Sequence, residues 1–371
     1  MVWDAKVKFF LGVYPNDIGT LKVAKTLEKT FPTRVTVIIN KIEGPTSKGQ
    51  MLNEMFKQVF EAPGSSPEIV VLHDSEDVID PRTFQVFSAY VRAGFDFVQV
   101  PVFSLHRGDA LIASTYMDEF AERHTREMII RNAVSAAIPS AGVGTGITGK
   151  LIKHFLRTRH QVLMSGTVTE DYILGVEAKR EGFKVAFAAI SADDPSGLDF
   201  VATREFFPKT LSASIKQKTR WVYGINFEAM HKLGWQGDLW DKYFFMRDRK
   251  GIVTNFLPPL SLFLLLMLIG GAFDLSDLPS DWRYWFNFSI LFNMLALVMR
   301  YIIRLGACFQ VYGSWDPLGI ALRWPLALYI NMAAVFHAWV IYVGVSQFAT
   351  KPIVWSKTAH ELPDDFMSAK R

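Results

Sequence analysis

Residues 70–81 have the sequence Val-Val-Leu-His-Asp-Ser-Glu-Asp-Val-Ile-Asp-Pro, an apolar run followed at once by acidic side chains. The apolar run is typical of a buried β-strand. Asp74, Glu76 and Asp77 would then follow its carboxyl end, which is where ligands bind in open α/β sheets. Carboxylate oxygens are the ligands that Mg²⁺ and Mn²⁺ prefer. The stretch therefore predicts either a metal-assisted ligand site or an acidic turn that caps a helix starting near Pro81.

Strand-like and helix-like segments alternate on both sides of this stretch, up to about residue 190. The predicted strands cover residues 7–13, 35–39, 69–72, 97–102 and 184–188. The predicted helices cover residues 18–30, 48–60, 81–93, 116–136 and 171–181. This alternation predicts a nucleotide-binding α/β domain with a mostly parallel sheet.

A glycine-rich run, Ser-Ala-Gly-Val-Gly-Thr-Gly, occupies residues 140–146. Its glycines would let a ligand approach the backbone closely. The run does not match a dinucleotide-binding fingerprint, because it follows a helix-like segment and has no suitably placed acidic residue downstream. Taken alone, it predicts a flexible loop.

Residues 167–172 have the sequence Thr-Val-Thr-Glu-Asp-Tyr and open a predicted helix. Thr169 is a suitable N-cap, and acidic residues are favourable in a first helical turn. Capping is therefore a sufficient structural explanation of Glu170. A carboxylate at this place is also well placed to act as a general base, and the two interpretations are compatible.

Composition excludes several other classes of protein. The formal net charge of +4 is modest, and acidic and basic residues are interspersed in the first half, so nucleic acid is not an expected partner. The single cysteine, Cys308, lies in an apolar run, which predicts a buried thiol and excludes an internal disulfide. Residues 1–6 lack the basic and apolar regions of a signal peptide, so we expect the first half to stay in the cytosol.

Charged residues become rare after Lys250. The 23 residues between Lys250 and Asp274 carry no charge, which is enough to cross a hydrocarbon core of about 30 Å. A second apolar run covers residues 284–299 and extends further if the arginine that follows reaches toward the head groups. A third run, residues 324–350, is broken by Pro325, and a span, a re-entrant segment and an interfacial helix are all compatible with it.

Arginine-rich segments flank the first two apolar runs, whereas the loop between those runs is acidic. By the positive-inside rule the arginine-rich flanks are cytosolic and the loop lies outside. We therefore predict a cytosolic α/β domain over residues 1–245, a membrane region over 246–350 and a polar tail over 351–371. Within the membrane region the predicted segments are the spans 252–273 and 284–304 and the third apolar segment 324–348.

Four segments, taken in order, resemble the motifs of family 2 glycosyltransferases with the GT-A fold. Gly-Pro-Thr-Ser-Lys-Gly-Gln-Met-Leu-Asn at residues 44–53 is similar to the lysine-containing loop and helix beside the nucleotide. Asp74-Ser-Glu-Asp77 resembles the DxD metal motif, and Thr169-Glu-Asp171 resembles the TED motif. Gln217-Lys-Thr-Arg-Trp221 is similar to the QxxRW motif of membrane-attached synthases. The resemblance implies a GT-A α/β domain followed by transmembrane helices.

Further stretches resemble the phage adsorption protein B branch of this family, at residues 13–17, 73–78, 139–145, 247–251 and 355–360. Members of the branch usually begin with a membrane helix and a first strand, whereas this chain begins at what corresponds to the second strand. The turn that contacts the base in many members is replaced by Tyr14-Pro-Asn-Asp17, and Asp17 is its one counterpart.

The resemblance implies an inverting transfer of a sugar from a nucleotide-sugar donor, expected to be a UDP-sugar, to a growing polysaccharide or a lipid-linked acceptor. Asp171 would be the catalytic base with Glu170 beside it. Mg²⁺ or Mn²⁺ would be held by Asp74, Glu76 and Asp77. The implied donor-binding residues are Asp17, Lys48, Asp74, Gly144, Thr145, Gly146, Gln217, Arg220 and Trp221.

The same resemblance implies a multi-pass protein of the bacterial inner membrane, with membrane lipids and export or outer-membrane proteins as further partners. The alternative function is a non-catalytic membrane scaffold for polysaccharide export or phage adsorption, which the absent first strand favours. For Trp221 the alternative is an aromatic anchor at the membrane interface, and for Lys48 it is a solvated surface lysine.

Overall fold

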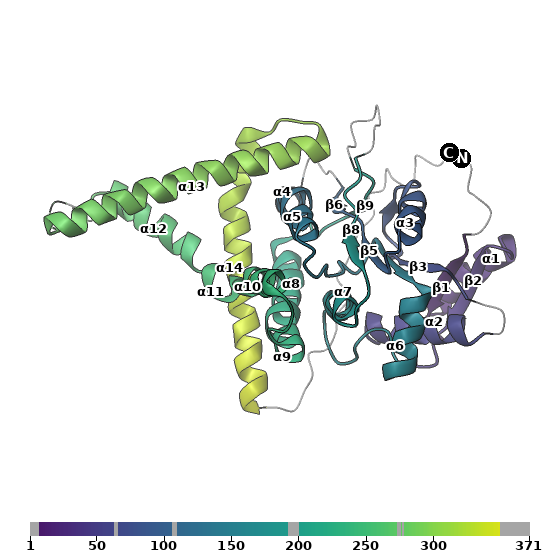
Figure 1. Ribbon diagram of the computed structural model, residues 1–371. Coiled ribbons are helices and arrows are strands. Elements are labelled where there is room, and N and C mark those ends of the chain that lie inside the picture. The colour runs from purple at the N-terminus through teal and green to yellow at the C-terminus, as the bar shows by residue number, and fades with distance from the viewer. Residues whose placement is uncertain are drawn as a thin grey trace.

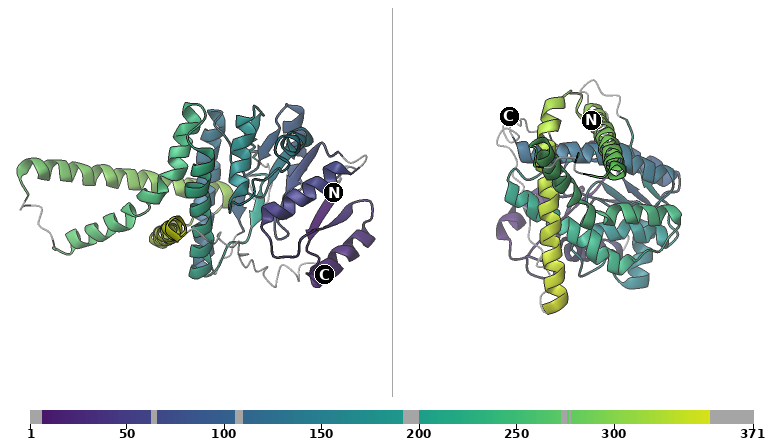
Figure 2. Two further views of the ribbon diagram at one scale, coloured as in Figure 1. Left: turned by 90° about the horizontal axis from the view of Figure 1, so that it is seen from below. Right: turned by 90° about the vertical axis from the view of Figure 1, so that its left-hand side faces the viewer.

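The computed structural model describes residues 7–62, 66–105, 110–191, 200–272, 276 and 278–348 (Figure 1). An α/β domain forms the first part of the chain. Helices α12 (Leu257–Ile269) and α13 (Ser280–Tyr312) project from one side of this domain, and helix α14 (Pro317–Phe348) lies between them and the domain. Figure 2 shows the same arrangement from two further directions.

The described strands form three sheets. Strands β1 (Phe9–Val13) and β2 (Val35–Ile39) pair in parallel. A four-stranded sheet has the order β3 (Ile69–Leu72), β7 (Thr145–Thr148), β5 (Phe97–Gln99) and β8 (Val185–Phe187). A three-stranded sheet has the order β4 (Val78–Ile79), β9 (Thr203–Glu205) and β6 (Val102–Ser104). In the four-stranded sheet β3, β5 and β8 run in one direction and β7 runs against them, so the predicted, mostly parallel strand direction is confirmed.

The predicted strand at residues 97–102 is wrong in one respect, because the structure divides it between two sheets. Strand β5 ends at Gln99 and β6 begins at Val102, with Pro101 between them. Proline has no backbone N–H to donate to a ladder. Its carbonyl oxygen instead accepts a hydrogen bond from Thr203 N at 2.9 Å, which begins the pairing with β9.

The prediction that the glycine-rich run is a flexible loop is wrong for its last two residues, whereas residues 140–144 lie outside any helix or strand. Residues from Thr145 onward form β7 in the middle of the four-stranded sheet. A Cβ atom on Gly146 would come within 2.6 Å of the Phe87 ring, and one on Gly144 within 2.6 Å of Thr203 Oγ1. Small residues are therefore required here because neighbouring elements pack directly against the backbone.

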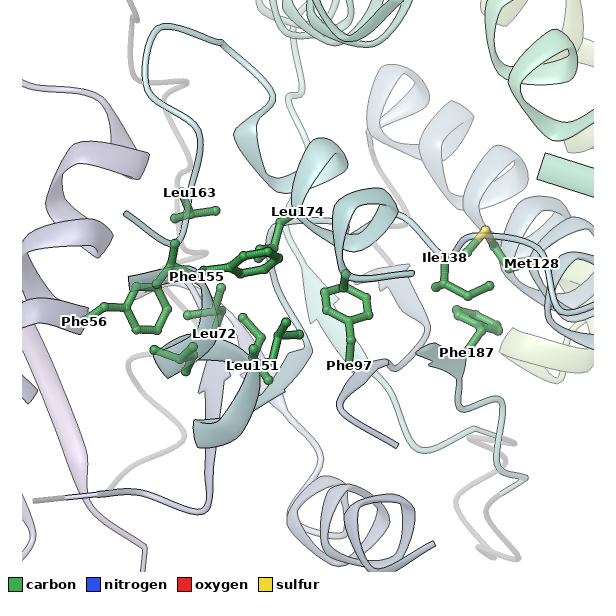
Figure 3. Packing of buried hydrophobic residues seen from close by; sticks show 14 residues of the cluster. Phe56, Leu72, Phe97, Met128, Ile138, Leu151, Phe155, Leu163, Leu174 and Phe187 are labelled. Carbon is green, nitrogen blue, oxygen red and sulfur yellow. The ribbon is translucent and has the colours of Figure 1, made fainter. Parts of the chain in front are cut away.

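Helices cover the sheets, and side-chain caps mark the first residues of α1, α2 and α6. Ser47 caps α2 by accepting a hydrogen bond from Gln50 N at 3.1 Å, and Thr148 caps α6 in the same way. The helices of this domain are α1 (Ile18–Thr30), α2 (Lys48–Glu61), α3 (Thr83–Arg92), α6 (Gly149–Arg159) and α7 (Glu170–Arg180). Their apolar faces enclose a core in which Phe56, Phe97 and Phe155 are almost fully buried (Figure 3).

Two longer helical runs each contain a π-helical turn. One run consists of α4 (Leu111–Glu122), η1 (Arg123–Glu127) and α5 (Met128–Ala133), which begins and ends earlier than the predicted helix at residues 116–136. The other consists of α8 (Leu211–Val222), η2 (Tyr223–Glu228) and α9 (Ala229–Leu233). These two runs form the side of the α/β domain on which α13 and α14 pack.

The first predicted membrane span is not one straight helix. Helices α10 (Leu239–Arg249) and α11 (Gly251–Thr254) are followed by α12 after a bend of 47°. Pro258 and Pro259 occupy the first turn of α12, where prolines are tolerated because their missing N–H groups have no helical partner. The 13 residues of α12 span about 20 Å, which is less than the hydrocarbon thickness of about 30 Å.

Helix α13 and residues Pro317–Gly344 of α14 are each long and apolar enough to cross a membrane, by length and composition. The first two thirds of α13 are exposed along their length, whereas the last third packs on α4, where Arg304 Nε donates to Glu122 Oε2 at 2.6 Å. Helix α14 packs on α4 and α8 through Arg323 and Asn331. The predicted buried thiol is confirmed, because Cys308 is enclosed at this junction.

Candidate functional site

A large open cleft of about 1970 Å³ runs along the α/β domain. It is lined by the carboxyl end of β3, the first turns of α2 and α7, and the middle of α8. It continues past α4 and η1 to α13 and α14, where Arg300, Arg304 and Trp324 line it. The cleft therefore connects the strand ends with the membrane-proximal helices.

Lys48 lies at the centre of the polar part of the cleft. Its Nζ forms an ion pair with Asp74 Oδ1 and donates to the carbonyl oxygen of Gly142 at 3.1 Å. Burial alone would lower the pKa of Lys48, but the negative charges of Asp74 and Asp171 outweigh it and raise this pKa. The alternative of a solvated surface lysine is therefore not what the structure shows.

Asp171 stands in the first turn of α7, beside the same lysine. Its Oδ1 accepts a hydrogen bond from Tyr172 N at 2.7 Å. Gly142 has a φ of +85°, and a Cβ atom there would come within 2.5 Å of Asp171 Oδ2. Burial raises the pKa of Asp171, and the positive charges of Lys48 and Arg220 oppose this rise without cancelling it. A carboxylate with a raised pKa is well suited to accept a proton.

The Glu170 side chain lies against the first turn of α2, beside the Gly49 backbone. Its side chain is buried, and a Cβ atom on Gly49 would come within 2.9 Å of its Cγ. Burial and the neighbouring charge of Asp171 raise the pKa of Glu170. This placement makes Glu170 part of the contact between α2 and α7.

The three acidic residues after β3 do not all face the cleft. Asp74 and Glu76 line it. The Asp77 side chain is turned inward, where Oδ2 accepts from Asp74 N at 2.9 Å and lies 3.1 Å from His73 Nδ1. Burial raises the pKa of Asp77, and its Oδ1 is buried with no hydrogen-bond partner. Asp77 therefore organises the turn that presents Asp74.

Glu205 is a further carboxylate of this site, and sequence reasoning missed it. It ends β9 and lines the cleft near Asp74 and Lys48. Burial and the neighbouring charges of Asp77 and Asp74 raise the pKa of Glu205 well above its usual value. Strand β9 has three residues, which is too short for any periodic signal to reveal it.

The expected divalent cation can be compared with these side chains. The described residues contain no group of three or more acidic, histidine or cysteine side chains arranged to hold a metal ion. The donor chemistry fits a hard cation, because Asp74, Glu76 and Glu205 present carboxylates to one cleft. Burial first, and then the neighbouring charges of Asp77 and Asp74, keep the pKa of Glu205 well above its usual value.

Helix α8 brings the Gln217, Arg220 and Trp221 side chains to the cleft. Arg220 is close enough to Asp171 for its charge to act on that carboxylate. Gln217 is buried, and its Oε1 has no hydrogen-bond partner. The Trp221 ring contacts the rings of Tyr116 and Phe120, with centroid distances of 6.0 and 6.1 Å, which fixes its orientation at the cleft.

Four residues predicted to bind the donor do not line the described part of the cleft. Gly144, Thr145 and Gly146 belong to β7 or its start, and Thr145 Oγ1 donates to Gln99 Oε1 at 2.7 Å inside the core. Asp17 caps α1 by accepting from Thr20 N at 3.0 Å. Packing and capping explain these four residues.

The cleft presents acidic and lysine side chains at the strand ends of an α/β domain, and helices that are long and apolar enough to cross a membrane follow this domain. The model of one family, described as glycosyltransferase like family 2, matches residues 4–224. The chain therefore belongs to the family 2 glycosyltransferases.

Two curated relatives are each 29% identical to the chain over 386 aligned residues. They are the bacteriophage adsorption protein B of Escherichia coli K12 and the bacteriophage N4 adsorption protein B of Escherichia coli O157:H7. Each alignment covers 95% of this chain and 50% of the relative. The chain thus spans about half the length of these relatives.

Proposed function

We propose that the protein is an inverting glycosyltransferase that moves a sugar from a UDP-sugar to a glycan or lipid-linked acceptor at the inner face of the bacterial inner membrane. One observation carries the proposal: Asp74 and Asp171, from two distant motifs, both act on Lys48 within one cleft. This juxtaposition supports a donor phosphate group and an acceptor hydroxyl meeting at the same place.

In this mechanism Asp171 accepts the proton of the acceptor hydroxyl as its oxygen attacks the anomeric carbon. The new bond joins the acceptor oxygen to that carbon, and the bond between the carbon and the phosphate oxygen breaks. The nucleoside diphosphate leaves with the electron pair of the broken bond. Attack from the face opposite the leaving group inverts the anomeric centre, and the raised pKa of Asp171 suits the proton transfer.

The leaving diphosphate needs positive charge beside it. Lys48 and Arg220 supply it from the protein, and the forked guanidinium of Arg220 suits a phosphate group. A divalent cation would be held by Asp74 and Glu76 with Glu205 nearby, and when bound it would neutralise the charge that develops on the diphosphate. Asp77 would support the cation-binding carboxylates by holding the turn that carries Asp74.

The acceptor would enter from the membrane side of the cleft. The cleft continues to Trp324 on α14 and Arg300 on α13, and the Trp221 ring stands along the way with a fixed orientation. An aromatic face at this place suits a sugar ring of the acceptor. Export or outer-membrane proteins would then carry the product outward, in keeping with the phage adsorption named for the relatives.

The proposal is tested with purified protein in lipid vesicles, a panel of UDP-sugars and Mn²⁺ or Mg²⁺. We expect cation-dependent release of UDP and transfer of labelled sugar to a lipid or glycan fraction. If no donor binds with cation present, the alternative function, a non-catalytic membrane scaffold, is supported instead.

Gly142 offers a test of the position of Asp171. We expect Gly142→Ala to lower transfer by about 10²-fold, because its Cβ atom would displace Asp171 Oδ2 and small misplacements have effects of this size. Gly94→Ala is the matched control, since Gly94 has a φ of +86° and open space around it. Both variants carry the same backbone strain, so equal loss of activity in both would contradict the proposed role of the contact. Initial rates and thermal unfolding are measured together.

Glu205 offers a test of how a buried carboxylate beside Asp74 and Asp77 affects stability. Its pKa is raised in the folded state, so the stability it contributes is fully present below the unfolded pKa of about 4.3 and is lost as the pH rises through the folded pKa. We expect Glu205→Gln to raise the melting temperature by about 2–4 °C at pH 8. The gain in melting temperature should shrink on acidification, because the wild-type carboxylate is then protonated. It should also shrink when Mn²⁺ is added, because the cation stabilises the wild type more than the variant. Scanning fluorimetry across a range of pH measures the melting temperatures, with Glu181→Gln as an exposed control. A Glu205→Gln variant that is less stable than the wild type at every pH would refute the prediction.

A further inference from the structure

Tyr172 directly follows Asp171, the proposed base, and is almost fully buried. Its backbone N–H donates to Asp171 Oδ1 at 2.7 Å, and its hydroxyl donates to Asp248 Oδ2 at 2.6 Å. Burial and the charge of Asp248 raise the pKa of Tyr172, so the phenol stays protonated and is the donor of this bond. One residue thus contacts the base through its backbone and a distant carboxylate through its side chain.

Asp248 lies in the last turn of α10, and its side chain is 2% exposed. Its Oδ2 also accepts a hydrogen bond from Arg131 Nη1 at 2.9 Å, and its Oδ1 lies 3.8 Å from Arg123 Nη2. A carboxylate that faces two guanidinium groups is stabilised in its charged form. Hydrogen bonds to a charged acceptor are stronger than bonds between neutral groups, so the Tyr172 hydroxyl is firmly held.

A second polar contact joins α7 and α10 about two turns away. Lys179 Nζ donates to both carboxylate oxygens of Asp241 at 2.8 Å. Along α7 this contact lies seven residues after the tyrosine, and along α10 it lies seven residues before Asp248, so the two helices run in opposite directions. Between the two contacts, Val176 and Phe245 belong to one buried apolar cluster. Helix α10 therefore holds α7 along two turns.

Stability alone is a weak reason for the charged group around Asp248. Taking two charges out of water costs about as much as their attraction returns, and apolar residues of similar size are often as stable. The arrangement also leaves Arg131 Nη2 buried with no hydrogen-bond partner among the described residues. What the group does hold is the Tyr172 hydroxyl, and the N–H of the same residue contacts the base.

We propose that Tyr172 and Asp248 are positioning residues for Asp171. The bond between them holds the first turn of α7 against α10, and this turn carries the N–H that orients the Asp171 carboxylate toward the acceptor. Neither residue transfers a proton. This inference rests on the proposed function, in which Asp171 is the base. It gives α10, which leads through α11 to the apolar helix α12, a part in the geometry of the site.

Tyr172→Phe tests the proposal by removing one hydroxyl and keeping the ring in the core. We expect kcat for transfer to fall by about 10-fold with an unchanged KM for the UDP-sugar, because the base is misplaced while the donor still binds. Tyr312→Phe is the matched control. Its hydroxyl donates to the carbonyl oxygen of Ser104 at 3.1 Å, and Tyr312 does not line the described part of the cleft.

The control separates positioning from stability. Each variant loses one hydrogen bond, so we expect both melting temperatures to fall by about 2–6 °C. The kcat of Tyr312→Phe should nevertheless stay at the wild-type value. Equal kcat in the two variants would overturn the proposal.

Asp248→Asn tests the other partner of the bond. This change also removes the charge that pairs with Arg131, so the double variant with Tyr172→Phe is measured beside it. If both residues act on the base through one bond, the double variant should be no slower than the slower single variant. Losses in kcat that multiply in the double variant would overturn the coupling. If Asp248→Asn does not fold, Tyr172→Phe decides alone.

Amide hydrogen exchange separates this proposal from the proposed reaction. The wild type, Tyr172→Phe and Tyr312→Phe are compared in lipid vesicles by mass spectrometry of peptides that cover α7. We expect exchange in the first turn of α7 to become about 10-fold faster in Tyr172→Phe and to stay unchanged in Tyr312→Phe. A wild type without transferase activity would refute the proposed reaction, and exchange would still decide whether the bond holds the turn. Unchanged exchange in Tyr172→Phe would overturn the positioning role in either case.

Discussion

Asp171→Asn is expected to lower sugar transfer by about 10²–10⁴-fold while the protein remains folded and still binds the donor. The substitution keeps the size and the contact with Tyr172 N but removes the group that accepts the acceptor proton. The loss should appear in kcat, because the missing interaction belongs to the transition state. Initial rates with saturating UDP-sugar and cation, together with donor binding by calorimetry, check this expectation.

The pH profile distinguishes a base from a structural carboxylate. Burial raises the pKa of Asp171. As the pH is lowered, the rate of wild-type transfer should therefore begin to fall at a higher pH than it would if the base were an aspartate with an ordinary pKa. The residual activity of Asp171→Asn should lack this acidic limb. Glu181→Gln, an exposed position just after α7, is the control and should keep both rate and profile. Turnover retained in Asp171→Asn would remove Asp171 from the mechanism.

Asp74→Asn is expected to lower transfer by about 10³-fold, equivalent to about 4 kcal/mol of transition-state stabilisation. The reason is that Asp74 presents the cleft-facing carboxylate that pairs with Lys48, and the variant loses the charge that would bind a cation. Donor binding should also lose its dependence on Mn²⁺. Titration of the donor with and without Mn²⁺, followed by initial rates, measures both effects.

Asp77→Asn is the matched control from the same motif. The asparagine side-chain oxygen can still accept from Asp74 N, and the carboxylate oxygen it replaces has no hydrogen-bond partner. We therefore expect transfer within a few-fold of wild type. A loss in Asp77→Asn as large as that in Asp74→Asn would show that Asp77 binds the cation, and our reading of the turn would be wrong.

Some local elements could be predicted from the sequence with correct bounds. The helix at residues 18–30 and the strands at 35–39 and 69–72 have the bounds that were expected. In each case the sequence pattern that predicts the element is local. It consists of a capping residue next to the helix, or of apolar residues repeated along the element itself. Helix α7 begins at Glu170, directly after Thr169, but the predicted cap is wrong, because the Thr169 side chain makes no capping hydrogen bond.

Other elements could not be predicted because their partners are distant in the chain. Strand β7 is specified by the space beside Phe87 and by pairing with β3, more than 70 positions away. Glu205 reaches the site through the pairing of β9 with β6, which no local pattern reports. The orientation of Asp77 depends on His73 and on the fold of one turn.

The order of residues is enough to predict the class of this protein. The order of the motifs, the loss of charge after Lys250 and the acidic end of β3 are all visible in the order of residues, because chemistry and hydropathy are properties of side chains. In contrast, only the three-dimensional fold shows which carboxylates share the cleft and how α14 lies against the domain. Both features depend on the direction of side chains and on packing between segments that are distant in the chain. The periodic pattern of apolar residues within one segment does not report either of them. The third apolar segment shows this most clearly, because its composition suits a span whereas the structure packs it along α4 and α8.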